Sequence, residues 1–242
     1  MRREALILLA LLAVSCAALD QSYIQSVSRD GTSTISKTSE LTLFTTVLTN
    51  KSFASMKQAC ESGKNLDCIV DVKAKTVTIT ESFSPGGYYT YSSEYGIPEV
   101  AYTLTINKIP NDKFASSLSK LLIAANISGA AEGAGSVNPI DFEDEANNRE
   151  AAGILRQIRA NLTYTIVMPF DVDEAHAGNI TGTVSGKTVT FDLVSLLQES
   201  KPIVVRSREL NLGYIVLFIG LIAVAALAFS FFWSKPMKKK KG

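Results

Sequence analysis

His176 is the only histidine in the 242-residue chain, and Asp171, Asp173 and Glu174 lie just before it. An imidazole with nearby carboxylates is an arrangement that can bind zinc or move a proton in acid–base catalysis. A metal-assisted enzyme acting through His176 is therefore one hypothesis. The segment offers no second His or Cys ligand, and its composition is typical of a solvated loop, which is the interpretation that the residues favour.

A second acidic group, formed by Asp141, Glu143, Asp144 and Glu145, could bind calcium, which takes several oxygen ligands. The run lacks the alternating spacing of a calcium-binding loop, so a solvated acidic loop is favoured. The sequence contains no serine-nucleophile elbow, no dinucleotide fingerprint and no phosphate loop. The glycine-rich run at 129–135 follows a predicted helix instead of joining a strand to a helix, so it does not predict a phosphate site. We expect no catalytic residue, no metal and no cofactor.

Tyrosines are concentrated in one stretch of the chain. Tyr88, Tyr89, Tyr91 and Tyr95 lie within eight positions, and Tyr102 follows. Tyrosine rings are favoured on surfaces that a ligand or a partner half buries. Packing within a sheet would explain them equally well. The first four are the candidate ligand-binding residues.

Two cysteines, Cys60 and Cys68, lie in the part of the chain that we expect to be exported. In an oxidising compartment such a pair is expected to form a disulfide bond. A metal-binding pair is the alternative, but it would have only one histidine to draw on.

Four segments fit the N-x-Ser/Thr pattern for N-glycosylation, and all precede the C-terminal apolar segment. Together they suggest a eukaryotic or archaeal cell. The acceptor residues are Asn50, Asn126, Asn161 and Asn179.

Residues 212–233 contain no charged side chain and are followed by a tail, 234–242, that contains Lys235 and four consecutive lysines. Roughly 20 apolar residues in a helix cross the hydrocarbon core of a membrane. The sequence predicts a transmembrane helix with Tyr214 and Trp233 at its two interfaces. The positive-inside rule then places the tail in the cytoplasm and the rest of the chain outside it. This predicts a single-pass type I protein of the cell membrane.

The N-terminus has the features of a signal peptide over 1–18, namely two arginines, an apolar stretch and small residues at its end. Cys16 leaves an alternative open, because the residues before it loosely match the lipid-attachment motif of bacterial lipoproteins, with Ala13 where that motif prefers leucine. A further alternative concerns the compartment. The lysines near the C-terminus stand where a dilysine retrieval signal places them, which in a eukaryote would indicate the endoplasmic reticulum.

The remaining segment, 19–209, is long enough to form one domain with its own core. The formal net charge of the whole chain is +1 and includes the tail lysines, so the exported part is mildly acidic. It has no basic stripe, which argues against a nucleic-acid partner.

Apolar periodicity predicts an α+β, sheet-dominated domain with two or three helices. Helices are expected at 51–61, capped by Asn50 or Ser52, and at 111–123, capped by Asn111. Asp30-Gly31 is expected to turn a first hairpin. Further strands are expected at 68–72, 76–83, 88–91, 100–106 and 162–168, with a last hairpin formed by 178–184 and 187–193.

Three motifs near the end of the domain resemble the closing signature of the LppM-type domain found in actinobacterial lipoproteins. They are Tyr164 to Pro169, Ala177 to Asn179 and Gly186 to Phe191, within 162–193. The chain departs from that pattern with Phe170 after the proline and with Phe191 in place of tryptophan. The resemblance implies a small α+β surface module that binds envelope lipid or glycolipid without enzymatic activity.

The sequence therefore predicts a membrane-anchored, extracytoplasmic binding module whose ligand is a lipid-like or glycan component of the envelope. A structural subunit of a cell envelope or surface layer is the alternative, and an enzyme is a third possibility. The expected partners are the membrane, which the chain would span once, and a lipid, a glycan or an envelope protein.

Overall fold

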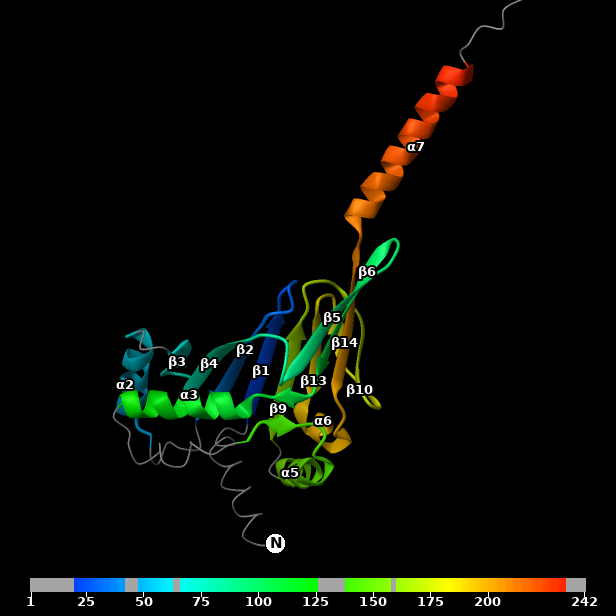
Figure 1. Ribbon diagram of the computed structural model, residues 1–242. Coiled ribbons are helices and arrows are strands. Elements are labelled where there is room, and N and C mark those ends of the chain that lie inside the picture. Colours follow the sequence, from blue (N-terminus) through cyan, green and yellow to red (C-terminus); the bar gives the residue numbers. More distant parts are fainter. Residues whose placement is uncertain (1–19, 42–47, 63–65, 126–137, 158–159, 234–242) are drawn as a thin grey trace, which may run out of the picture.

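The computed structural model of the protein describes residues 20–41, 48–62, 66–125, 138–157 and 160–233. Over these residues the fold is α+β and rich in strands, as predicted (Figure 1). Several predicted features lie outside the described residues: the signal peptide with Cys16, Asn126, the glycine-rich run and the lysine tail.

The larger of two extensive sheets has seven strands in the order β12-β13-β9-β1-β2-β4-β3. The strands are β1 (Asp20–Val27), β2 (Ser33–Glu40), β3 (Cys68–Asp71), β4 (Thr76–Phe83), β9 (Asn161–Val167), β12 (Thr183–Ser185) and β13 (Thr188–Asp192). The predicted first hairpin is confirmed, because β1 and β2 pair antiparallel across Asp30 and Gly31. Gly31 has a φ of +86°, a conformation that favours glycine. On its other side, β1 pairs parallel with β9.

The second sheet has five antiparallel strands in the order β11-β10-β14-β6-β5. They are β5 (Tyr89–Tyr95), β6 (Glu99–Ile106), β10 (Val172–Ala177), β11 (Ile180–Thr181) and β14 (Ile203–Leu210). The interpretation of the segment around His176 as a loop is wrong. It forms β10, in which Val172, Ala175 and Ala177 are buried in the core, while the consecutive Asp173 and Glu174 lie exposed where the strand register shifts.

Four helices precede the C-terminal one in the described part of the chain. They are α2 (Asn50–Glu61), α3 (Asn111–Ala124), α5 (Glu145–Gln157) and α6 (Leu193–Glu199). Two short strands pair with each other on either side of α3 in the sequence: β7 (Lys108–Ile109) precedes the helix and β8 (Ile140–Asp141) follows it. In Figure 1, α3 crosses the outer strands of the larger sheet, and α5 and α6 lie together at the end far from the C-terminal helix. The sequence did not predict α5 or α6.

Both predicted helices exist, but their caps differ from the prediction. Thr49, not Asn50, caps α2, and Ser52 takes part by bonding back to the Thr49 backbone. Asn111 does not cap α3, since it is the first helical residue and its side chain is buried. Its Oδ1 accepts hydrogen bonds from the Tyr23 hydroxyl (3.2 Å) and from Lys37 Nζ (2.7 Å). The Asn111 side chain, which the sequence pattern assigned to the helix cap, is instead hydrogen-bonded to residues of β1 and β2.

The predicted disulfide bond joins Cys60 in α2 to Cys68 at the start of β3, with a sequence separation of 8. It holds α2 against the edge of the seven-stranded sheet. Replacing both cysteines by alanine is expected to lower the free energy of unfolding by about 2 to 3 kcal/mol, because the unfolded chain regains the entropy of an open loop. Urea denaturation of the two proteins measures the difference. Equal midpoints and slopes would contradict the prediction.

One continuous core lies between the two sheets and beneath the helices. It includes a polar group that links three strands. The Tyr164 hydroxyl donates to Gln25 Oε1 (2.6 Å), and Gln25 Nε2 donates to Ser33 Oγ (3.2 Å). All three residues are buried. Burial raises the pKa of Tyr164 above its usual value, so its hydroxyl keeps the proton that it donates.

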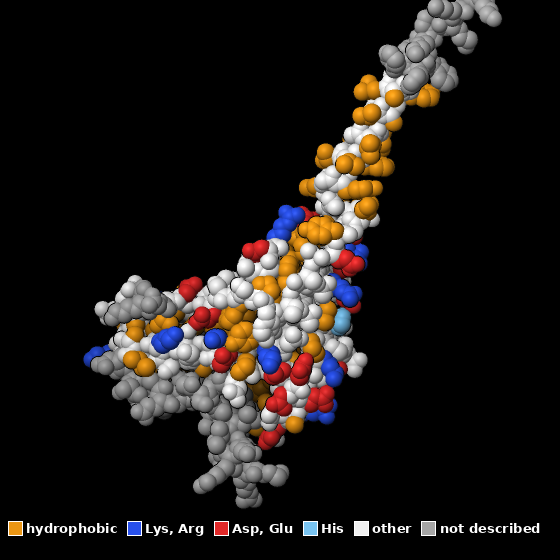
Figure 2. All heavy atoms as spheres, viewed as in Figure 1, with side chains coloured by type: hydrophobic (Ala, Val, Ile, Leu, Met, Phe, Trp, Pro, Cys, Tyr) orange, Lys and Arg blue, Asp and Glu red, His pale blue; other side chains and the backbone are white. Residues whose placement is uncertain are grey.

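The C-terminal helix, α7 (Leu212–Trp233), extends away from the domain (Figure 1). Leu212–Ser230 has a mean hydropathy of 2.7 and is not buried against the rest of the chain. By length and composition it could cross a membrane. Figure 2 shows apolar side chains along its visible surface, while the charged side chains gather on the domain.

A single residue, Asn211, connects β14 to α7. Its N–H donates to the carbonyl of Pro98 (2.7 Å), and its carbonyl accepts from the N–H of Ile215 (3.1 Å). Its Oδ1 also accepts from the N–H of Tyr214 (3.2 Å), which caps the helix. The residue that joins β14 to α7 is therefore hydrogen-bonded both to the β5–β6 turn and to the first turn of the helix.

Candidate functional site

The four candidate tyrosines do not form one surface. Tyr89 is 1% exposed and its hydroxyl donates to the carbonyls of Gly31 and Phe83, so it belongs to the core. Tyr88 is partly buried, with its hydroxyl on the Asp112 carboxylate (3.2 Å). Because side chains alternate along a strand, Tyr91 and Tyr95 share the Tyr89 face of β5, and Tyr88 does not. Of the four, only Tyr95 is exposed, at 79%.

Tyr91 begins a row of stacked rings that crosses from one sheet to a neighbouring loop. Its ring stacks on Tyr102 of β6, with centroids 6.0 Å apart, and Tyr102 stacks on Phe170 at 4.9 Å. The guanidinium of Arg29, in the β1–β2 turn, lies 5.5 Å from the centroid of Phe170. Such a contact between a cation and an aromatic face is attractive. The row brings together residues from three separate parts of the sequence.

Charged groups surround the Tyr102 end of this row. Glu209 Oε2 accepts hydrogen bonds from Arg29 (2.7 Å) and from the Tyr102 hydroxyl (3.1 Å). The Tyr102 hydroxyl and the Glu209 carboxylate raise the pKa of Arg29. The Thr32 hydroxyl and N–H lower the pKa of the Asp30 carboxyl beside it. The site thus places the Arg29 guanidinium beside the carboxyl groups of Asp30 and Glu209.

The phenols at this site remain protonated near neutral pH. Burial raises the pKa of Tyr102, and burial raises that of Tyr91 to about 12. The Tyr91 hydroxyl is also buried without a hydrogen-bond partner among the described residues.

Four of these residues, Arg29, Asp30, Tyr102 and Glu209, line a cavity of about 610 Å³ at the junction between the domain and α7, which we call the junction pocket. The β1–β2 turn contributes Arg29 and Asp30, and β5 and β6 contribute Tyr95 and Tyr102. The end of β14 and the first turn of α7 close it with Glu209, Leu210, Asn211, Leu212 and Gly213. Of the four candidate tyrosines, only Tyr95 lines this pocket. Sequence reasoning missed the charged residues of the pocket, which lie at opposite ends of the domain sequence.

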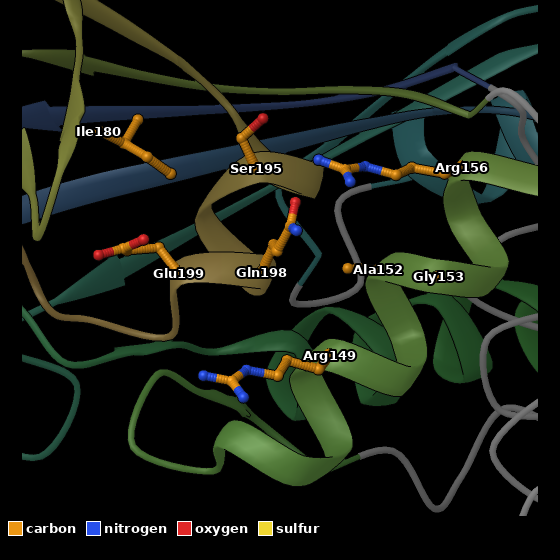
Figure 3. A pocket seen from close by; sticks show the side chains of 8 residues that line it. All are labelled: Arg149, Ala152, Gly153, Arg156, Ile180, Ser195, Gln198 and Glu199. Carbon is orange, nitrogen blue, oxygen red and sulfur yellow. The ribbon is translucent and has the colours of Figure 1, made fainter.

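A second cavity, of about 660 Å³, lies between α5 and α6. Figure 3 shows Arg149 and Arg156 extending from α5, with Gln198 of α6 between them. Both arginines are exposed, Arg149 is ion-paired with Glu145 (3.5 Å), and Glu199 accepts from the N–H of Asn179 (3.1 Å). This open, polar groove is less suited than the junction pocket to an amphipathic ligand.

The two acidic candidate sites form no metal cluster in the part of the chain that the structure describes, where no three His, Cys, Asp or Glu side chains converge. Glu174 Oε1 lies 3.3 Å from His176 Nε2, and its other oxygen is paired with Arg206 (3.1 Å). The acidic run is not a loop throughout. Asp141 pairs with Lys108 (2.6 Å) in the β7–β8 ladder, and Glu145 begins α5.

Three of the four predicted glycosylation residues, Asn50, Asn161 and Asn179, lie within the described residues and are exposed. Their modification stays a prediction.

Comparison with known proteins gives no relative for this chain: no protein family, no curated protein and no solved structure matches it.

Proposed function

We propose that the protein is a single-pass, membrane-anchored binding module, and that its extracytoplasmic domain binds a lipid-like or glycan component of the envelope in the junction pocket. The observation that carries this proposal is the position of the pocket. Its wall includes Leu212 and Gly213, the first turn of the helix that could span a membrane. A ligand in this pocket would lie where the polar heads of envelope lipids lie.

The membrane arrangement in this proposal follows from charge and length. The 22 residues of α7 suffice to span a hydrocarbon core, and the lysines of the C-terminal tail favour the cytoplasmic side. The domain then stands outside the cell, or in the lumen of the endoplasmic reticulum if the source is a eukaryote that reads the lysines as a retrieval signal.

The chemistry of the pocket suits an amphipathic ligand. Tyr95, which is exposed, offers a ring face against which a sugar or a glycerol backbone packs. Arg29 can donate to a phosphate, and Asp30 and Glu209 can accept from hydroxyl or amino groups. A volume of about 610 Å³ falls within the range of small-molecule sites. The resemblance to LppM-type domains supports the same class of ligand.

The test uses the full chain, extracted in detergent from its native membrane, with the copurified small molecules measured by mass spectrometry. Tyr95→Ala is expected to lower the amount of the bound component about tenfold, the change that about 1.4 kcal/mol of lost contact produces. Glu94→Ala is the matched control, because Glu94 is also exposed but lies on the opposite face of β5. If the two variants retain the component equally, the ligand does not bind in the junction pocket.

A further inference from the structure

Exposed apolar side chains gather at the tip of the β5–β6 hairpin and beside it. Tyr95 is 79% exposed and Ile97 is 71% exposed, and the neighbouring Leu210 and Leu212 are 54% and 67% exposed. We call these four residues the tip patch. A soluble domain seldom gathers large apolar side chains at a hairpin tip without a partner to cover them.

Hydrogen bonds fix this tip beside the start of α7. The turn closes with the N–H of Gly96 on the carbonyl of Glu99 (2.9 Å), and the next residue back, Pro98, accepts from the N–H of Asn211. Leu210 is the register partner of Glu99. Figure 1 shows the hairpin reaching along β14 as far as the base of α7. These bonds keep the residue before α7, and so the first residue of the helix, next to the tip.

This geometry sets the depth of the tip in a membrane. If α7 spans the bilayer, its apolar stretch enters the hydrocarbon at Leu212, and the interfacial layer extends about 5 to 7 Å outward from there. The tip is bonded to the residue immediately before Leu212, so Tyr95 and Ile97 lie within that layer. Tyrosine is enriched at this depth. The charged pair of Arg208 and Glu99 (3.4 Å) lies just behind, at the level of water and head groups.

We propose that the tip patch is a second contact with the membrane and that Tyr95 and Ile97 enter the interfacial layer of the outer leaflet. The proposal rests on the membrane anchor of the proposed function. Its partner is the lipid surface itself, because the patch continues directly into the apolar surface of α7. With two points of contact, the domain cannot tilt freely, and the junction pocket between them opens onto the head groups.

The test places a polarity-sensitive fluorophore on a single cysteine in the full chain, reconstituted at low density in phosphatidylcholine vesicles. A Cys16→Ala background removes the remaining thiol, since Cys60 and Cys68 are bonded to each other. Ile97→Cys is compared with Ile69→Cys in β3, which is 69% exposed and carries the same side chain at a position remote from α7. Phe218→Cys in α7 reports on the anchor.

The fluorophore at position 97 is expected to emit at shorter wavelength than at 69 and to be quenched by lipids with a nitroxide near the head group. Iodide in the water should reach it about tenfold less well, the ratio that about 1.4 kcal/mol of apolar burial produces. Equal behaviour at 97 and 69, with position 218 quenched by lipid, would overturn this inference alone. Position 218 left unquenched by lipid would overturn the membrane anchor. Protection of position 97 from iodide without quenching by lipid would show that a second copy of the chain covers the patch, which also overturns the proposal.

Discussion

Replacing Gln25 by methionine is expected to lower the free energy of unfolding by about 2 to 4 kcal/mol, although the two side chains are similar in size. Gln25 is fully buried between β2 and β9 and is bonded to a hydroxyl on each side. Methionine would leave both hydroxyls, those of Tyr164 and Ser33, in the core without this partner. Each buried polar group that loses its partner costs about 1 to 2 kcal/mol.

A double-mutant cycle separates this effect from a change in packing. Tyr164→Phe alone removes the donor to Gln25 Oε1 and should cost about 1 to 3 kcal/mol. The double variant with Gln25→Met should lose less stability than the sum of the two single variants, because the second substitution removes one of the orphaned groups. Urea denaturation of the four proteins gives the coupling energy. Strict additivity would show that the 2.6 Å hydrogen bond contributes nothing.

The second large effect is expected at Gly182, between β11 and β12. A Cβ atom at this position would lie 2.4 Å from a methyl of Val189 and 2.7 Å from the ring of Phe191, both in the rigid core. Gly182→Ala should therefore destabilise the domain by about 1 to 3 kcal/mol through overpacking.

Gly153→Ala is the matched control for that substitution. Gly153 lies within α5, and a Cβ there meets no atom within 4 Å. Alanine should stabilise the helix by about 0.5 to 1 kcal/mol. The midpoint of thermal unfolding should thus fall for Gly182→Ala and rise for Gly153→Ala. A shift of both in the same direction would contradict the packing argument.

Local signals predicted the local parts of this fold. The Asp30-Gly31 turn, the two predicted helices of the domain and the disulfide depend on residues near one another in sequence, so their patterns could be read directly. The α5 helix was missed because its apolar face consists of short or polar side chains, with Asn148, Ala151 and Ala152 buried beside Leu155. The β14 strand was missed because its charged residues resemble the flank of a membrane span.

The candidate site could be predicted only in part, for a related reason. The tyrosine-rich stretch drew attention to β5, but strand alternation and the position of the second sheet decide which rings face a cavity. Tyr89 and Tyr95 lie on the same face of β5, but Tyr89 is buried in the core and Tyr95 is exposed at the surface. Arg29 and Glu209 are 180 positions apart, and only the pairing of the strands brings them together.

The strand order also dictates when the domain can finish folding. β1, near the start of the described chain, lies in the middle of its sheet, and one of its two neighbours is β9. Its contacts with β9 join distant residues, since the bonded pair of Gln25 and Tyr164 is 139 positions apart. β14 fills the middle of the other sheet and is the last strand before α7. Contacts so distant in sequence form slowly. If the chain is exported from its N-terminus, the unpaired strands wait in the outer compartment until β14 emerges, one residue ahead of the membrane helix. The domain then closes while it is already tethered, so its final folding step takes place at the bilayer surface.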